Sequence, residues 1–512
     1  MKTWLWVAVI CLVFGQAAVA ADAELLWFAQ GRPTPQALEA MNILASAEDE
    51  GLSPGDYAVD RLRSELERLL WGGGTPAEIA RWDAALTEAM TRFLQHVHSG
   101  RVDPFSVQVR FSGLAHQAFA PKDRLIAAVR RGRLAQLVDE LAPKIPLYAQ
   151  IRDALGAFRR MAADPRVAAL WDEPLPSLPG GKVAPGQSYL GLPLVVRRLK
   201  ALGDLPPETP ESSVMTPDIV QGIRAFQQRH GLLVDGVLGR RTAARLNVSP
   251  AAGVRQMELT MERLRWARLL GRRVVAVYLP ENVLEAYEVD GAGNTSVRLR
   301  MRVITGSALK TPTPIFDDAI RAIELSPYWN VPFSIAREEL IPKFLRDPEV
   351  FYREGFEFVL GDGSVDTGLS AERLDAVAQG RIRLRQRPGP YNPMGDIKFI
   401  LSNKDGIFLH HTATPQLFER ARRDLSHGCI RVEDPIRLAQ FVLEDDPSWD
   451  VERLRAAMGQ SVPTVLRVRR PAQVLLLYCT VRVQAGRPAF LADIYGLDRV
   501  LDQALRYAAA HP

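Results

Sequence analysis

The chain reads Val274-Val275-Ala276-Val277-Tyr278-Leu279 at the point where the spacing of its apolar residues changes from helical to strand-like. Similar runs follow at residues 283–287 and 297–304. Successive side chains of a strand point to opposite faces, so this period of two predicts strands. We therefore predict a β-rich domain over residues 272–470.

Two other segments belong to this half of the chain. Residues 326–358 interrupt the strand pattern with Trp329-Asn330-Val331-Pro332 and a helical stretch at residues 335–342. An insertion of this length in a sheet domain often covers a site, so we predict a lid there. Residues 471–512 are predicted to form a strand and a helix that pack on the helical first part of the chain or on the β-rich domain.

The first half of the chain has helical spacing. Apolar residues recur at three-and-four spacing within residues 22–172, which we predict to be a helical scaffold domain. His96, His98 and His116 fall in it and are interpreted as structural or surface residues. A linker rich in Pro and Gly follows, and residues 187–250 are predicted to be a small helical domain. With 512 residues, the chain is expected to be an α+β multidomain protein.

The first twenty residues are typical of a secretory signal. Lys2 precedes an apolar run at residues 4–14, and Ala18-Val19-Ala20 supplies small residues for cleavage. The run is too short for a comfortable membrane span. We expect residues 1–20 to be a signal peptide and the protein to be exported to the periplasm. An uncleaved signal would instead anchor it in the inner membrane.

Composition and charge exclude several classes of protein. Apolar residues make up 47% and charged residues 24% of the chain, which does not fit a disordered or polytopic membrane protein. The net charge is +5, and no basic stripe with interleaved aromatic residues is present, so nucleic acid is not an expected partner.

The densest group of reactive side chains lies in Phe408-Leu409-His410-His411 and Ser426-His427-Gly428-Cys429-Ile430-Arg431. A cysteine nucleophile needs a base, because a free thiol with a pKa of about 8.5 is mostly protonated at neutral pH. Gly428 allows a sharp bend, so that backbone N–H groups can face an oxyanion. Cys479 lies in an apolar run and is expected to be an inert buried thiol; a bridge to Cys429 is the alternative.

Two alternatives remain open for this cluster. His410 and His411 cannot both face Cys429 if one strand continues through them, so one of them is not part of the site. Zinc could also bind here, because zinc accepts the donors of His410, His411, His427 and Cys429. A zinc-dependent wall peptidase is therefore the alternative hypothesis. The usual zinc spacings are not clearly met, and we expect no metal and no cofactor.

Two motifs resemble known families. Phe226, Gln227, Gly231, Leu232, Asp235, Gly236, Gly239 and Thr242 follow the signature of the helical peptidoglycan-binding module. Asp235-Gly236 would form a tight turn, and Thr242 could cap the last helix. His410, separated by fifteen residues (411–425) from Ser426-His427-Gly428-Cys429, resembles the L,D-transpeptidase signature. Residues 310–312, 327–332, 385–389, 395–399 and 431–433 resemble the large multi-domain Gram-negative subfamily with a YkuD-type catalytic domain.

The resemblance implies a set of roles. Cys429 would be the nucleophile and His410 the general base, oriented by the backbone carbonyl of His411, with His427 and Gly428 completing the catalytic set. The remaining candidates are assigned to substrate binding: Arg431, Ser426, His411, Trp329 and Tyr328. Arg431 could equally have a structural role, and Tyr328 and Trp329 could shield the acyl-enzyme from water.

The implied reaction forms 3→3 peptidoglycan cross-links. Cys429 would attack the third residue of a tetrapeptide donor stem, release the terminal D-Ala and pass the acyl group to the amine of an acceptor stem. Water in place of the amine would make the enzyme an L,D-carboxypeptidase. The resemblance also implies a role in wall biogenesis and cell shape, and reaction with carbapenems. Other cell-wall synthesis proteins could be further partners.

Overall fold

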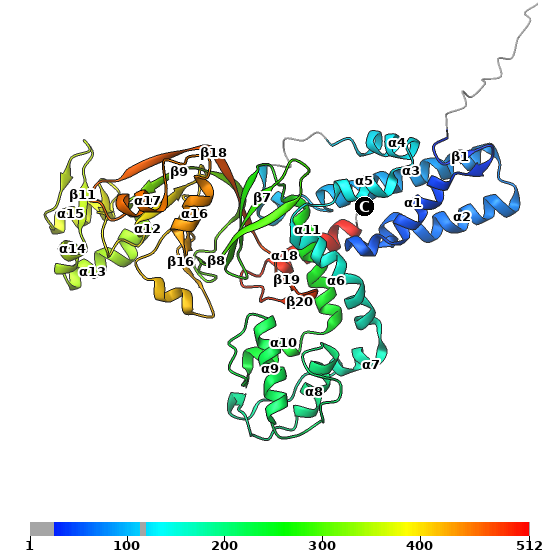
Figure 1. Cartoon of the computed structure of the whole chain (residues 1–512), viewed down its shortest axis with the longest axis horizontal. Coiled ribbons are helices and arrows are strands. Elements are labelled where there is room, and N and C mark those ends of the chain that lie inside the picture. The colour runs from blue at the N-terminus through cyan, green and yellow to red at the C-terminus, as the bar shows by residue number, and fades with distance from the viewer. Residues whose placement is uncertain (1–24, 113–118, 511–512) are drawn as a thin grey trace, which may run out of the picture.

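The computed structural model describes residues 25–112 and 119–510, which form an elongated body with a smaller domain at its side (Figure 1). The predicted signal peptide and His116 lie outside the described residues. In the part of the chain that is described, none of the helices has the length and apolar character that a membrane span requires.

The β-rich domain is built on a ten-stranded sheet. The three strands predicted first are confirmed: β6 (Arg273–Tyr278), β7 (Val283–Val289) and β8 (Thr295–Gly306) pair antiparallel in sequence order. The other long strands are β9 (Ile315–Leu325) and β18 (Thr464–Leu477). β14 (Ile397–Ile400) pairs with β9 on one side and β15 (Leu409–His410) on the other, which closes the sheet on itself.

Closure of the sheet brings the predicted catalytic segments together. β15 pairs in parallel with β17 (Ile430–Val432), and β17 pairs with β8. The short strand β16 (Asp424–Ser426) also pairs with β8. Two helices, α16 (Pro435–Val442) and α17 (Val451–Ala457), follow β17.

The insertion is longer than predicted. β9 ends at Leu325, which pairs with Ile397 of β14, so the whole of residues 326–396 leaves and re-enters the sheet at one place. This segment, called the insertion below, has its own buried core around Phe344, Phe351 and Phe356. A strand that returns to complete its sheet cannot be recognised from periodicity alone. Its elements are β10 (Trp329–Asn330), α12 (Phe333–Ile335), a π-helical turn (Ala336–Leu340), α13 (Ile341–Arg346), α14 (Glu349–Arg353), β11 (Phe356–Val359), β12 (Val365–Asp366), α15 (Ala371–Ala378) and β13 (Arg383–Gln386).

The N-terminal part is helical, as predicted. The longest helix of this part begins after Thr75 because of a capping box. The Thr75 side chain accepts a hydrogen bond from the backbone N–H of Glu78, and the Glu78 carboxylate accepts one from the backbone N–H of Thr75. His96 is a structural residue, with Nδ1 2.9 Å from the hydroxyl of Tyr57. The helices are α1 (Pro35–Ala45), α2 (Val59–Gly72), α3 (Pro76–Ser99), α4 (Pro121–Arg130), α5 (Leu134–Leu141), α6 (Pro146–Ala163) and α7 (Pro165–Ala168), with the short strands β1 (Phe28–Ala29), β2 (Arg32–Pro33) and β3 (Val109–Arg110).

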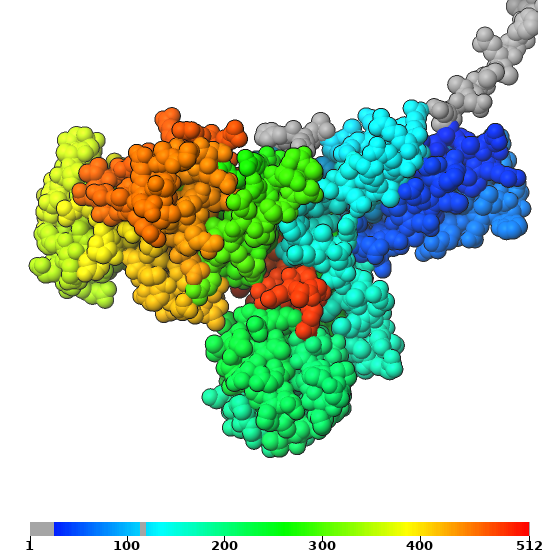
Figure 2. Space-filling model, in the orientation of Figure 1, coloured from blue at the N-terminus to red at the C-terminus, as the bar shows by residue number. Residues whose placement is uncertain are grey.

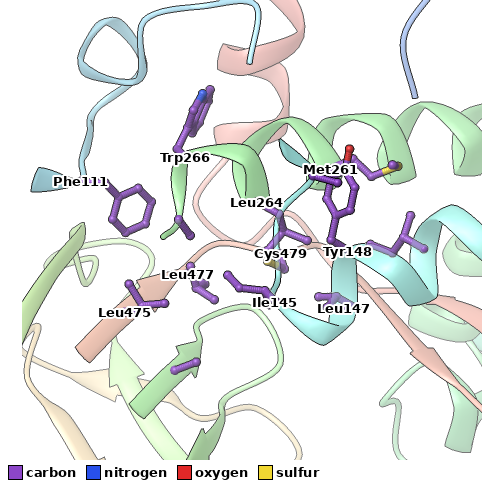
Figure 3. Close-up of a cluster of buried hydrophobic side chains, with 14 of the residues drawn as sticks. Phe111, Ile145, Leu147, Tyr148, Met261, Leu264, Trp266, Leu475, Leu477 and Cys479 are labelled. Atoms are coloured by element: carbon purple, nitrogen blue, oxygen red, sulfur yellow. The ribbon is translucent and has the colours of Figure 1, made fainter. Parts of the chain in front are cut away.

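The scaffold and the β-rich domain share one hydrophobic core. Helix α11 (Pro250–Trp266), which fell between the predicted domains, packs against α6 and carries Met261, Leu264 and Trp266 into that core. Figure 3 shows these side chains beside Tyr148 of α6 and Leu477 of β18. The scaffold also adds β3 to the edge of the sheet, next to β9. The two parts therefore fold against each other as one unit.

The small helical domain lies beside this unit (Figures 1 and 2). It has a separate core around Phe226, and Asp235-Gly236 forms the predicted turn, with Gly236 at φ +73°. The predicted capping role of Thr242 is wrong. The last helix begins after Gly239, and the Thr242 hydroxyl is buried and accepts from Gln227 instead. The elements are β4 (Lys182–Val183), α8 (Leu192–Ala201), α9 (Pro217–Arg229), β5 (Leu238–Gly239) and α10 (Arg240–Leu246).

The C-terminal segment contacts all three parts. The predicted boundary at residue 470 is wrong, because β18 crosses it without a break. The hairpin β19 (Val481–Gln484) and β20 (Arg487–Phe490) packs on α6, and Pro488 accepts a hydrogen bond from Arg229 of the small domain. Helix α18 (Leu497–Ala510) packs on α11. This hairpin lies between the small domain and the rest of the molecule (Figures 1 and 2).

Candidate active site

The turn between β16 and β17 holds the predicted nucleophile. Gly428 has φ +111°, a conformation that side chains rarely adopt, so glycine is needed there. The buried hydroxyl of Thr313 donates to the carbonyl of Gly428 at 2.8 Å and accepts from the backbone N–H of Gly306 at 2.8 Å. A side chain on Gly306 would collide with the backbone of Thr311 and Thr313. The turn is thus fixed by close backbone packing.

Ser426 stabilises the same turn from within. Its side chain is buried, its hydroxyl donates to the Cys429 carbonyl at 2.5 Å, and it accepts from the backbone N–H of Gly428 at 3.2 Å. Its carbonyl accepts from the hydroxyl of Thr311 and the backbone of Ser307. These contacts occupy Ser426 inside the protein and argue against its predicted role in substrate binding.

Cys429 is partly buried and lies immediately before β17. Its Sγ lies 3.6 Å from the carbonyl oxygen of Gly406. Burial raises the pKa of the thiol, although a hydrogen bond from the backbone of Phe408 opposes this effect. The resting side chain is therefore a neutral thiol at neutral pH. Cys479 is free too and fully enclosed, and burial raises its pKa to about 12, which confirms the predicted inert thiol.

His410 is buried and held in one orientation. Its Nδ1 lies 2.5 Å from the carbonyl oxygen of His411, so the neutral ring carries its proton on Nδ1 and leaves Nε2 as the acceptor. Burial and the nearby Arg431 lower the pKa of His410 to about 3. An imidazole in this state is neutral and can take a proton.

Strand register places His410 and Cys429 on the same face of the sheet. His410 is the parallel partner of Arg431, and the backbone of Ile430 bonds to the carbonyl of Phe408. Two residues earlier on each strand, Phe408 is opposite Cys429. Residues two apart on a strand share a face, so Cys429 lies on the face of Arg431 and of its partner His410. His410 and Cys429 thus project to the same side.

His411 projects to the other face. The His411 side chain packs against Gly395, because a Cβ added to Gly395 would lie 2.7 Å from the Cβ of His411. Its Nδ1 is 3.6 Å from a carboxylate oxygen of Asp396. Of the two adjacent histidines, His410 has the geometry of a base, and His411 contributes its backbone carbonyl. The predicted contact of the His411 side chain with substrate has no support in this position.

Arg431 stands beside the nucleophile with few partners. Its guanidinium is largely buried, its Nη1 lies 3.4 Å from the hydroxyl of Thr414, and its Nε has no hydrogen-bond partner in the part of the chain that the structure describes. Burial lowers its pKa. A cation with unused donors on the face of Cys429 favours the predicted role in substrate binding.

His427 links the turn to the insertion. Its Nε2 is 2.8 Å from a carboxylate oxygen of Glu339, which lies in the π-helical turn of the insertion. Glu339 could not be found from the sequence, because one acidic residue in a charged helical stretch carries no signal by itself. The two predicted aromatic residues pack within the insertion. The guanidinium carbon of Arg385 lies 4.1 Å from the centre of the Tyr328 ring, and Trp329 packs on the core of the insertion.

Within residues 25–112 and 119–510, no group of three or more His, Cys, Asp or Glu side chains is arranged to hold a metal ion. The side chains that strand register places on the face of Cys429 are the imidazole of His410 and the guanidinium of Arg431.

Known proteins resemble parts of this chain. A protein of Haemophilus influenzae named "Putative L,D-transpeptidase" is 30% identical over 230 residues, which cover 45% of this chain and 45% of that protein. Two solved structures also match. The L,D-transpeptidase of Xylanimonas cellulosilytica (residues 123–326) is 15% identical, with 60% of this chain and 100% of that chain covered and a TM-score of 0.18. The L,D-transpeptidase of Stackebrandtia nassauensis is 12% identical, with 58% and 94% covered and a TM-score of 0.19.

Three family descriptions match successive parts of the chain. Residues 20–155 match a "Scaffold domain", and residues 192–246 match a "Putative peptidoglycan binding domain". Residues 272–452, which contain His410 and Cys429, match the YkuD family, described as "L,D-transpeptidase catalytic domain". The chain therefore carries an L,D-transpeptidase catalytic domain of the YkuD family, together with a scaffold domain and a peptidoglycan-binding domain.

Proposed function

We propose that the protein is an L,D-transpeptidase that forms 3→3 peptidoglycan cross-links through a thioester on Cys429. The observation that carries the proposal is the placement of His410 and Cys429 on one face of adjacent strands, with the His410 ring fixed by the His411 carbonyl. The YkuD match over residues 272–452 supports the reaction class, and the peptidoglycan-binding domain supports the substrate.

The first step is acyl transfer to the enzyme. Cys429 Sγ attacks the carbonyl carbon of the third stem residue, a diamino acid, and the S–C bond forms. His410 Nε2 takes the thiol proton and returns it to the amine of the terminal D-Ala, whose C–N bond breaks. The enzyme then holds the donor stem as a thioester.

The second step releases the enzyme. The side-chain amine of an acceptor stem attacks the thioester carbonyl, a new amide bond forms, and the S–C bond breaks. His410 removes the proton from the attacking amine and returns it to the sulfur. If water attacks instead, the same site acts as an L,D-carboxypeptidase, so the chemistry of the acceptor alone distinguishes the two activities.

The electrostatics favour a proton transfer that accompanies attack. The pKa of Cys429 is raised and that of His410 is lowered to about 3, so both groups are neutral before the substrate binds. A stable thiolate and imidazolium pair would require the opposite shifts. The carbonyl oxygen gains charge during attack, and hydrogen-bond donors near Cys429 would have to stabilise it.

Arg431 and the insertion complete the proposed site. Arg431 has unused guanidinium donors beside Cys429, and we assign it to a carboxylate of the donor stem. The insertion reaches the turn through Glu339 and would limit the access of water to the thioester. Because the substrate is a wall polymer, we propose that the protein acts outside the cytoplasm, in the periplasm, after export by residues 1–20.

Mass spectrometry of the intact protein tests this mechanism. Incubation with a soluble disaccharide-tetrapeptide should give an adduct on Cys429 that lacks the terminal D-Ala, and the products should contain 3→3 linked dimers. Cys429→Ala should abolish both signals and keep the melting temperature, since one small thiol contributes little to stability. Cross-linking by the Ala variant would refute the proposal. Release of D-Ala without dimers would assign the carboxypeptidase activity.

A further inference from the structure

A groove of about 760 Å³ separates the peptidoglycan-binding domain from the catalytic domain. One wall consists of the loop after α9 and helix α10. The other contains residues 280 and 282, and the loop 421–424, which leads into β16 and the catalytic turn. Residues 491–494 of the C-terminal segment lie between the walls. A bound chain in this groove would thus touch both domains.

The binding-domain wall carries cations that the protein itself does not use. Arg240, Arg241 and Arg245 of α10 line the groove, and in the described part of the chain none of their side chains makes an ion pair or a hydrogen bond. The buried Arg229 of the same domain, by contrast, has a partner, since it is paired with Asp204. The exposed guanidiniums of Arg240 and Arg241 are therefore available to a ligand, whereas Arg245 is partly buried and interacts electrostatically with Asp498.

The acidic groups in the groove are already occupied. Asp235 accepts from the side chain of Gln227 and from the backbone of Val237. Across the groove, Asp424 is bonded to Arg422 by both of its carboxylate oxygens. The unpaired charge that faces a ligand is thus positive, which favours an anionic partner. Leu233 adds an apolar surface, being 66% exposed at the edge of the groove.

Arg482 of the C-terminal hairpin holds the two walls at a fixed separation. Its Nη2 donates to the carbonyl of Arg229 in the binding domain at 2.8 Å, and its Nη1 pairs with Glu281 of the catalytic domain at 2.8 Å. A groove that exists before binding costs less free energy to occupy than one that must form on binding. The spacing of its walls is thus part of the folded protein.

We propose that this groove binds carboxylate-bearing stem peptides of polymeric peptidoglycan, next to the stem that reacts at Cys429. The inference rests on the proposed function. Arg240 and Arg241 pair with the carboxylates, and Leu233 packs on apolar parts of the bound peptidoglycan strand. Through the loop 421–424, the bound strand lies against the segment that continues into the catalytic turn. The groove therefore selects polymer over free stem peptides.

Co-sedimentation with purified sacculi tests the groove. All variants carry Cys429→Ala, so that no turnover occurs. Arg240→Gln with Arg241→Gln should weaken binding about tenfold, as expected for the loss of charge-assisted hydrogen bonds. Both side chains are exposed, so the fold is kept. Arg224→Gln is the matched control, because Arg224 is an exposed arginine of the same domain that does not line the groove. It should bind like the parent.

Chemical modification of the sacculi tests whether their carboxylates are the groups that bind. Conversion of their free carboxylates to amides should weaken binding of the parent to the level of the double variant. Equal binding of the double variant and the parent, or equal binding to native and amidated sacculi, would overturn the proposal. Loss of binding in Arg224→Gln as well would also overturn it, because charge anywhere on the domain would then suffice.

A separate measurement keeps this inference apart from the proposed function. With Cys429 intact, the Arg240→Gln, Arg241→Gln variant should be acylated by a soluble disaccharide-tetrapeptide at the parental rate, while its cross-linking of sacculi falls. If the parent itself is not acylated, the proposed function fails, and the co-sedimentation result still decides whether the groove binds peptidoglycan. If the double variant loses activity equally toward the soluble substrate and toward sacculi, the groove has no special role in binding the polymer.

Discussion

His427 Nε2 lies 2.8 Å from Glu339 Oε1, although 88 positions separate the two residues in the sequence. His427 belongs to the catalytic turn and Glu339 to the insertion. Both side chains are about half exposed, and ion pairs of this kind contribute little to stability. The contact is thus suited to hold the insertion against the turn while allowing it to separate, as entry of a large substrate requires.

Glu339→Ala should raise hydrolysis of the acyl-enzyme relative to transfer. Without this contact the insertion spends more time away from the turn, and water gains access to the thioester. The ratio of free tripeptide to cross-linked dimer, measured by chromatography, should increase severalfold at an unchanged melting temperature. Glu338→Ala is the matched control, since the structure gives Glu338 no such contact in its described part. An unchanged ratio in Glu339→Ala would exclude a shielding role.

His410→Ala should lower the rate of Cys429 acylation by about 10² to 10⁴-fold, the usual contribution of a general base. His411→Ala should leave the rate near that of the native enzyme, because its side chain projects away from Cys429 and its backbone carbonyl remains in place. Time-resolved mass spectrometry of the carbapenem adduct measures both rates. The reverse ranking would assign the base to His411.

The fold illustrates what periodicity can and cannot predict. Strands β6, β7 and β8 follow one another and pair with their neighbours, so local alternation is enough to find them. The pairing of β9 with β14 joins segments about 70 residues apart, and no local pattern encodes the return. Helix α11 was not assigned to any domain, because its second half is buried on every side and includes charged residues such as Glu262 and Arg265, so it lacks an amphipathic pattern.

The site was predictable where the chemistry is local in sequence. His410 and the turn from Ser426 to Cys429 were found from their spacing, and strand alternation alone required that one of the two adjacent histidines lie apart. The sequence could not decide which one, because that depends on the register between β15 and β17. It also could not find Thr313 or Glu339, which reach the turn only through the folded sheet and the insertion.

The acylation rate should be nearly independent of pH between about 5 and 8. The pKa of His410 is lowered to about 3, so its imidazole is neutral throughout that range, and the raised pKa of Cys429 keeps the thiol protonated. Acylation should decline only in strong acid, as His410 gains a proton. Alkylation by iodoacetamide, which requires a thiolate, should be slow at pH 7 and rise in alkaline solution. An alkylation rate that is already maximal at pH 6 would demonstrate a preformed thiolate and contradict this assignment.

Glu262→Gln should destabilise the scaffold and catalytic domain together. Glu262 is fully buried in α11, pairs with Arg265 at 2.7 Å and accepts from the backbone of Arg101. Removing its charge leaves buried guanidinium groups without compensation, which costs about 3 to 5 kcal/mol. Because the two domains share a core, thermal unfolding should show one cooperative transition at lower temperature. Glu288→Gln, which breaks an exposed pair with Arg272, should have little effect.

Thr313→Val should slow acylation without removing any group that contacts substrate. The Thr313 hydroxyl bonds to both Gly306 and Gly428, so its loss leaves a buried N–H and a carbonyl unpaired, at a cost of about 1 to 3 kcal/mol. The glycine turn then loses its support, and Cys429 loses its fixed orientation, which should lower the acylation rate about tenfold or more. Thr313→Ser keeps the hydroxyl and should restore the rate. If the Val variant unfolds at a lower temperature but is acylated at the native rate, the hydroxyl stabilises the fold and does not position the nucleophile.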